Sequence, residues 1–241
     1  MMLSLIIFVP LIGGLAILLA GRRGGASIKY IALLTVLVDF VLSLLALDTF
    51  NWGFAPKTVA LFDGLFQVAS PFQLREHLPW LAGWGISYTV GADPLSMLLV
   101  VLATFLGIFG VLCSFTAVND REPLYYFFLL LLQTGILGTF LALDLFLFYI
   151  FWELMLIPLY FLIGMWGSKN RVYATMKFVL YTLVGSVLML LGILNVYFKS
   201  RAVGLNTFSY ELLMFSHNLG GDSLLAPHLQ FWPFLAFFAA F

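Results

Sequence analysis

The sequence contains few charged residues and very little cysteine. Only 9% of its 241 residues are charged and 63% are hydrophobic, whereas average soluble proteins have about 25% charged and about 45–50% apolar residues. A soluble fold cannot bury so large an apolar fraction. A bilayer solvates apolar side chains, and helices within it satisfy their own backbone groups. Composition therefore predicts an all-α integral membrane protein, a multi-pass helical bundle.

The scarcity of ligating residues argues against several kinds of site. Cys113 is the single cysteine, so neither an intrachain disulfide nor an iron–sulfur ligand set can form. His77, His217 and His228 do not have the spacing of a metal site. We therefore expect no metal or redox cofactor on this chain. Basic and acidic residues balance at 11 each, so we expect no nucleic acid partner; the expected surroundings are other membrane helices and the lipid bilayer.

Six apolar runs are long enough to cross a bilayer, which takes about 20 residues. They are residues 3–20, 28–47, 94–117, 123–143, 145–166 and 172–198. A seventh run starts near His228 and is too short to span at about 1.5 Å per residue, so we expect the chain to end inside a helix at Phe241. We divide the chain into a three-helix region, 1–117, with a long outer loop at 48–93, and a second region, 118–241.

The distribution of positive residues predicts the orientation of these spans. One side of the predicted bundle has short connections that hold most of the basic residues, namely Arg22, Arg23, Lys29, Arg121, Lys169 and Arg171. The other side has the long segments 48–93 and 199–227. Because short cytoplasmic loops are enriched in Lys and Arg, the N-terminus and the long segments are predicted to lie outside.

Glu153 is the most informative residue, because it lies in the middle of the fifth apolar run. A carboxylate at mid-bilayer costs about 2.5–3.5 kcal/mol on insertion scales, and such residues usually face a bundle interior, a wet cavity or a proton relay. Pro158 lacks an N–H, so it leaves the carbonyl of Leu154 without its helical partner, next to this acid. We predict that Glu153 carries protons; the structural alternative is a neutral acid that hydrogen-bonds a neighbouring helix.

Other polar residues in or near the spans have weaker functional signals. Lys177 lies about 7–8 Å into the sixth span, so it either extends to the membrane surface or serves a water chain toward Glu153. Asp39 is expected to be structural, with Thr35 and Ser43 one turn away as local partners. Asp144 starts the fifth span and is most simply a helix cap, with a possible place on a proton path.

Small residues predict where the spans approach one another. Gly135 and Gly138 lie in the fourth run, and Gly185 with Ser186 lies in the sixth. Small side chains allow helix backbones in a membrane to come close. These positions are therefore predicted to be helix contacts.

Two sequence runs resemble a known family. FYIFWELMLIPLYFLIGMWG at 148–167, followed by YATMKFVLYTLVGSVLML at 173–190, closely resembles the M-type chains of bacterial respiratory complex I, NADH:quinone oxidoreductase. GISYTVGADPLSMLLVVLATFL at 85–106 fits the same family, although its members usually have glycine in place of Pro94 and isoleucine in place of Leu95. The motifs are specific around Glu153 to Pro158 and weakly informative at 48–84.

The resemblance implies an antiporter-like, proton-translocating subunit with fourteen helices and two inverted five-helix repeats, each with a half-channel. The family's acid on the fifth span matches Glu153. Its partner lysine lies on a broken seventh span a few positions beyond a sequence like FFAAF at 237–241, so the chain is expected to be truncated within the first repeat. The resemblance also implies a bacterial plasma membrane location and other membrane-arm subunits as partners, especially neighbouring antiporter-like chains. FMN, iron–sulfur clusters and quinone would be bound elsewhere in the complex.

Two alternatives remain open. The chain could be an antiporter subunit of a multisubunit cation/proton exchanger or of a membrane-bound hydrogenase, because these share the fold and the acid on the equivalent span. It could also be a purely structural chain of the membrane arm, with the pumping residues on another polypeptide.

Overall fold

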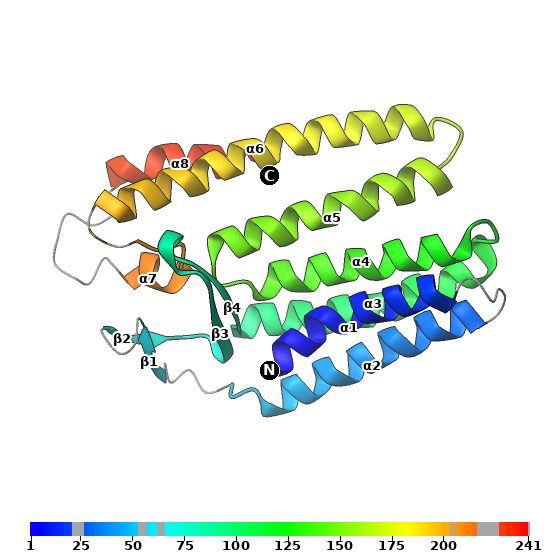
Figure 1. Cartoon of the computed structure of the whole chain (residues 1–241), viewed down its shortest axis with the longest axis horizontal. Helices are drawn as coiled ribbons and strands as arrows, with labels where there is room; N and C mark the ends of the chain where they lie inside the picture. The colour runs from blue at the N-terminus through cyan, green and yellow to red at the C-terminus, as the bar shows by residue number, and fades with distance from the viewer. Residues whose placement is uncertain are drawn as a thin grey trace.

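Six long apolar helices make up most of the molecule. The computed structural model describes residues 1–20, 27–52, 57–61, 66–202, 204, 206–215 and 227–240. Within these ranges, six helices are long and apolar enough to cross a membrane, which confirms the predicted multi-pass helical fold. They are α1 Met2–Ala20, α2 Ser27–Thr49, α3 Pro94–Ala117, α4 Glu122–Leu141, α5 Leu145–Trp166 and α6 Arg171–Ala202. Figure 1 shows them side by side along the long axis.

The helix bounds differ from the predicted spans in two instructive places. Helix α6 continues to Ala202, four residues beyond its apolar run, because helical hydrogen bonding does not stop at the first charged side chain. Helix α4 ends at Leu141, two residues earlier than predicted, because Ala142 pairs with Val90 and the Leu143 N–H donates to the carbonyl of Thr89. The α4–α5 link is therefore fastened to a strand.

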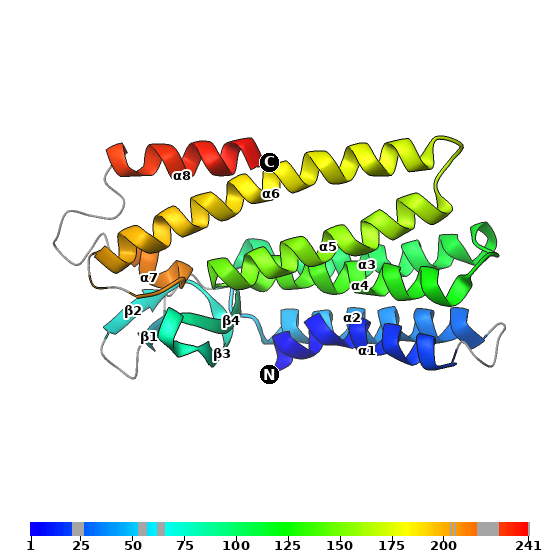
Figure 2. The same cartoon turned by 45° about the horizontal axis from the view of Figure 1, so that its top comes forward.

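The predicted outer loop at 48–93 contains strands, which the sequence analysis did not anticipate. They are β1 Lys57–Leu61, β2 Phe66–Ser70, β3 Gln73–Leu81 and β4 Ile86–Ala92, and they form two antiparallel pairs, β1–β2 and β3–β4. Isolated hairpins are marginal in water, and the β3–β4 pair packs against the helices α1, α3, α4 and α5. Figures 1 and 2 show both pairs and the short helix α7, Tyr210–Phe215, at one end of the bundle, here called the hairpin end.

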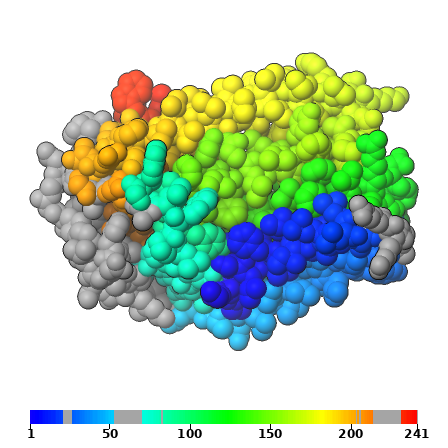
Figure 3. Space-filling view, in the orientation of Figure 1, coloured from blue at the N-terminus to red at the C-terminus, as the bar shows by residue number. Residues whose placement is uncertain are grey.

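A glycine is required where the β3–β4 hairpin turns. Gly85 has a φ of +67°, and a Cβ there would lie 2.7 Å from the backbone carbon of Asn206. The Phe208 N–H donates to the Gly85 carbonyl at 3.3 Å. In Figure 3 the hairpin, in cyan-green, lies between the orange residues of α6 and α7 and the blue residues of α1.

Helix α4 is central to the packing, because it contacts both α1 and α5. The last helix, α8 Pro227–Ala240, packs on α6. Contacts therefore cross the boundary predicted at residue 117, and the two-region division stays a prediction. At the end opposite the hairpins, Lys29 forms an ion pair with Glu122 at 3.1 Å. Arg22 and Arg23, which contribute to the predicted orientation, lie outside the described residues, as does His217.

Candidate functional site

Helix α5 is held in one rotation by close contact with α4. A Cβ on Gly135 would lie 2.6 Å from the Cγ of Met155, and a Cβ on Gly138 would overlap the ring of Phe151. The predicted close approach at these two glycines is confirmed. Because Phe151 and Met155 face α4, and residues two positions along a helix point about 200° away, Glu153 faces the opposite side.

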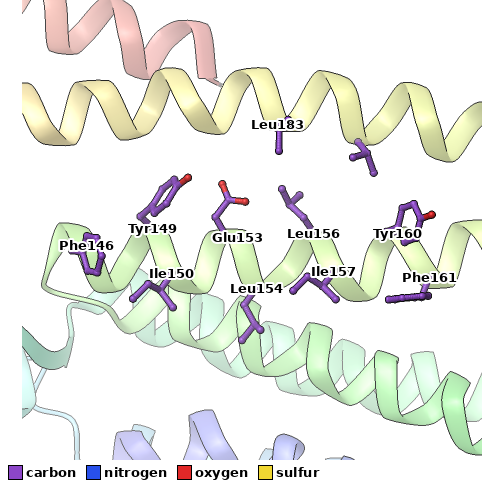
Figure 4. A pocket seen from close by; sticks show the side chains of 11 residues that line it. Phe146, Tyr149, Ile150, Glu153, Leu154, Leu156, Ile157, Tyr160, Phe161 and Leu183 are labelled. Carbon is purple, nitrogen blue, oxygen red and sulfur yellow. The ribbon is translucent and has the colours of Figure 1, made fainter. Parts of the chain in front are cut away.

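Glu153 points from α5 toward α6, as Figure 4 shows. It lines a cavity of about 600 Å³ between these helices. The other lining residues are mostly apolar: Phe146, Tyr149, Ile150, Leu154, Leu156, Ile157, Tyr160, Phe161, Val179 and Leu183. One carboxyl oxygen of Glu153, Oε1, is buried and has no hydrogen-bond partner among the described residues. An acid in this position has an unsatisfied oxygen that a water, a proton donor or a cation can approach.

Two hydroxyl groups accompany Glu153. The Tyr149 hydroxyl interacts with both the Glu153 carboxyl and the Ser186 hydroxyl of α6, and Tyr149 points toward α6 in Figure 4. Ser186 is buried, and its hydroxyl also donates to the Leu183 carbonyl at 3.0 Å. Sequence reasoning did not single out Tyr149 for the site. Its signal was available, since it lies four residues before Glu153 and therefore on the same helix face.

Asp144 is a fully buried acid at the N-terminus of α5. Its Oδ1 accepts hydrogen bonds from the N–H groups of Phe146 and Leu147 at 2.9 and 3.2 Å, which confirms the predicted cap. Its Oδ2 accepts from the Ser87 N–H at 3.1 Å and the Ser87 hydroxyl at 3.3 Å. Burial raises the pKa of Asp144 above its ordinary value, although these hydrogen bonds oppose the shift.

Lys177 does not join the cavity of Glu153. Its side chain is exposed on α6, and the residues of α6 that line the cavity are Val179 and Leu183. Both alternatives for Lys177, extension to the membrane surface and a role in a proton path, stay predictions.

Asp39 has a different partner from the predicted ones. Its Oδ2 accepts a hydrogen bond of 2.7 Å from the Gln133 side chain of α4. Thr35 and Ser43, the expected local partners, donate instead to the carbonyls of Ile31 and Phe40. The local pairing was therefore wrong, because side chains of neighbouring helices compete for buried polar groups. The Oδ1 of Asp39 is buried without a partner in the described part of the chain.

The described residues include no group of three or more His, Cys, Asp and Glu side chains that could hold a metal ion. Cys113 is exposed on α3. The expectation that this chain carries no cofactor stays a prediction, because a missing cluster among the described residues does not test it.

Comparison with known proteins shows similarity to one family of membrane subunits. The family described as NADH:quinone oxidoreductase/Mrp antiporter matches residues 142–241. NADH-quinone oxidoreductase subunit M of Pseudomonas aeruginosa is 35% identical over 248 aligned residues, covering all of this chain and 46% of the relative. Subunit M of Escherichia coli K12 is 34% identical, again over the whole chain and 45% of the relative.

A solved structure shows the same fold. A chain of respiratory complex I from Thermus thermophilus superposes with a TM-score of 0.76 at 27% sequence identity, covering all of this chain and 43% of that chain. The chain thus spans about half the length of the curated relatives it matches.

Proposed function

We propose that this chain, which is similar to the antiporter-like membrane subunits of NADH:quinone oxidoreductase and Mrp complexes, translocates protons in the membrane arm of an NADH:quinone oxidoreductase. The observation that carries this proposal is the Glu153 carboxyl, which lines an apolar cavity and has one buried oxygen without a partner. Intramembrane acids of this kind are costly and typically belong to ion or proton pathways.

The proposed role of Glu153 is to take up and release one proton inside the bundle. In general, a cation or hydrogen-bond donor that approaches a carboxyl favours its ionised form, and departure of that cation or donor favours the neutral acid. Tyr149 and Ser186 supply hydroxyl groups on the hairpin-end side of this acid. Tyr149 is a positioning residue that orients the carboxyl toward α6.

We further propose the surroundings of the chain. NADH oxidation and its cofactors belong to other subunits, and the chain contacts neighbouring antiporter-like chains of the membrane arm. The proposed membrane is the bacterial plasma membrane, with the hairpin end outside. Replacement of Cys113 by Ala, followed by Asn51→Cys or Lys169→Cys, tests the orientation with an impermeant maleimide. Labelling of position 51 from the outside and of 169 only after permeabilisation supports it; the reverse pattern refutes it.

Substitution of Glu153 tests the proton-carrying role. In the assembled complex, Glu153→Gln keeps the shape of the side chain and removes its titration, so proton translocation per NADH oxidised should fall while the complex still assembles. Glu153→Asp is the matched control, because it keeps an acid in the cavity and should retain part of the activity. Wild-type translocation in Glu153→Gln would refute the role and favour the purely structural alternative.

The second candidate is a cation/proton exchanger subunit, which the Mrp antiporters in the family description favour. Sodium dependence distinguishes the two functions. Proton translocation that is independent of sodium and coupled to NADH oxidation supports the first. Proton movement that requires a sodium gradient and continues without NADH supports the second.

A further inference from the structure

A row of hydroxyl groups connects an exposed histidine to a buried carboxyl at the hairpin end. The Nδ1 of His77 lies 2.7 Å from the Oγ1 of Thr89, and this oxygen lies 2.9 Å from the Oγ of Ser87. The Ser87 hydroxyl donates to the Oδ2 of Asp144 at 3.3 Å. His77 is exposed, whereas Thr89 is 1% and Asp144 0% exposed. The row therefore leads from the surface into the interior.

The fold explains why these four side chains are aligned. His77 and Thr89 are opposite each other in the β3–β4 register, so their side chains share one face of the hairpin. Ser87 is two residues from Thr89 and shares that face, since side chains alternate along a strand. The Leu143 N–H donates to the Thr89 carbonyl at 2.9 Å, which fixes the start of α5 against the same strand.

We propose that His77, Thr89, Ser87 and Asp144 form a proton relay between the aqueous phase at the hairpin end and the interior of the bundle. Asp144 also lines a cavity of about 510 Å³, bounded among others by Thr139, Phe140 and Phe148. A proton delivered to Asp144 therefore reaches the edge of this cavity, near the start of the helix that carries Glu153. That last connection rests on the proposed function; the relay itself does not.

Three successive proton transfers move one proton from His77 to Asp144. When the His77 imidazolium loses its Nδ1 proton to the Thr89 oxygen, the Thr89 proton passes to Ser87 and the Ser87 proton forms an O–H bond with the Oδ2 of Asp144. His77 is left neutral with its Nε2 proton, and Asp144 becomes a carboxylic acid. The two oxygens of Asp144 have separate roles. Oδ1 caps α5 throughout, whereas Oδ2 gains or loses the proton.

The other titratable groups near the two ends of the relay have contacts of their own. Glu76 accepts the Leu3 N–H at 2.8 Å at the start of α1, and Tyr88 contacts Ser4. Near Asp144, Asp93 caps α3 by accepting the Ser96 N–H at 2.7 Å.

Two more titratable groups among the described residues lie at the hairpin end. Glu211 of α7 forms an ion pair with Arg75 at 3.0 Å, and Tyr210 stacks edge-on against Phe72. Among the described residues, the hydrogen bonds from Thr89 and Ser87 therefore lead to Asp144.

Isotope exchange at Asp144 tests the relay without any need for pumping. The full-length subunit in its complex is reconstituted in lipid and moved from H₂O to D₂O, and the infrared band of the protonated Asp144 carboxyl is followed; Asp144→Asn identifies the band by removing it. Thr89→Val removes the hydroxyl at nearly constant shape, whereas Thr89→Ser keeps it. The relay predicts exchange at least about tenfold slower in Thr89→Val than in Thr89→Ser. Equal rates in the two variants overturn it.

The pH profile separates the relay from a merely structural contact. His77→Gln keeps a side-chain donor for Thr89 but cannot titrate near the ordinary histidine pKa of about 6.5. Exchange in the wild-type chain should change across this pH, and His77→Gln should abolish the change. If the exchange rate in His77→Gln depends on pH as it does in the wild-type chain, the relay is overturned.

Proton translocation, measured in the same preparations, distinguishes the two proposals. Slowed exchange in Thr89→Val together with full translocation in Glu153→Gln supports the relay and refutes the proposed function. Loss of translocation in Glu153→Gln with equal exchange in both Thr89 variants refutes the relay alone.

Discussion

Removal of the Arg75 guanidinium should strongly destabilise the hairpin end. Arg75 on β3 lies 3.0 Å from the Oε2 of Glu211 on α7, and Glu211 is 0% exposed while the Arg75 side chain is 16% exposed. Ser70 donates to the other oxygen, Oε1, at 2.5 Å. In Arg75→Met, the buried Oε2 of Glu211 loses the cation with which it is paired. Removal of one partner of a buried pair costs about 3–5 kcal/mol, equivalent to a hundredfold or greater loss in the ratio of folded to unfolded protein.

The double variant gives the decisive comparison. Arg75→Met with Glu211→Gln removes both charges, and replacement of a whole buried pair by neutral groups of similar size is often nearly neutral. Glu211→Gln alone should cost less than Arg75→Met alone, because the partly exposed Arg75 can turn to water. The coupling energy of this cycle should lie at the upper end of the usual range, about 2–3 kcal/mol.

The assay is a denaturation titration of the purified chain in detergent micelles, followed by far-ultraviolet circular dichroism. Limited proteolysis of the β3–β4 hairpin is a second readout, because loss of the ion pair should expose that segment first. The reasoning is refuted if the double variant is as unstable as Arg75→Met, since the cost would then not arise from an uncompensated Glu211.

Three further perturbations have defined outcomes. Gly138→Leu should lower the free energy of unfolding by about 1–3 kcal/mol, because the larger side chain overpacks against α5. Gly110→Leu, where a Cβ would meet nothing within 4 Å, should change it by less than about 0.5 kcal/mol. Equal changes in the same titration would contradict the packing argument. Gln133→Leu removes the donor from a buried Asp39 and should cost about 1–3 kcal/mol, with most of this recovered when Asp39→Leu is added; no recovery would contradict the pairing. Burial tends to raise the pKa of the Glu76 carboxyl. The amino group of Met1, the Ser4 hydroxyl and the Leu3 N–H outweigh burial and hold this pKa below 4.5. The ionised form is therefore favoured by folding, so its stabilisation is present above pH 4.5 and is lost as pH falls through the lowered value. The thermal midpoint of the wild-type chain should decline more steeply over that window than that of Glu76→Gln, and parallel curves would refute this.

The spans and the central acid were predictable because both are expressed in local sequence. An apolar run sets the length of a spanning helix, and α3 and α5 begin and end where their runs do. Glu153 stands out because no neighbour in sequence can neutralise it. The caps at Asp93 and Asp144 were likewise predictable, since a cap bonds to residues two or three positions away.

Pairings between distant residues were not predictable in this way. Asp39 and Gln133 are far apart in the chain and meet because α2 packs on α4. Ser186 reaches Tyr149 only through the crossing of α5 and α6. The strands within 48–93 were not predicted. The β3–β4 pair is stabilised by contacts with helices and with the segment around Asn206, and these distant contacts leave no pattern in the local sequence.

The packing of α1 on α4 has a consequence for biosynthesis. Glu122, the first residue of α4, follows Ala20, the last residue of α1, by 102 positions. At roughly 5–20 residues per second, about 5–20 s therefore pass between the synthesis of α1 and the start of synthesis of α4. Helix α1 is the most apolar of the six spans and α4 the least. Until then α1 packs on α2, which follows it in the chain, and its high hydropathy favours its retention in the bilayer. The more polar α4 enters the membrane when α1, α2 and α3 have already been synthesised.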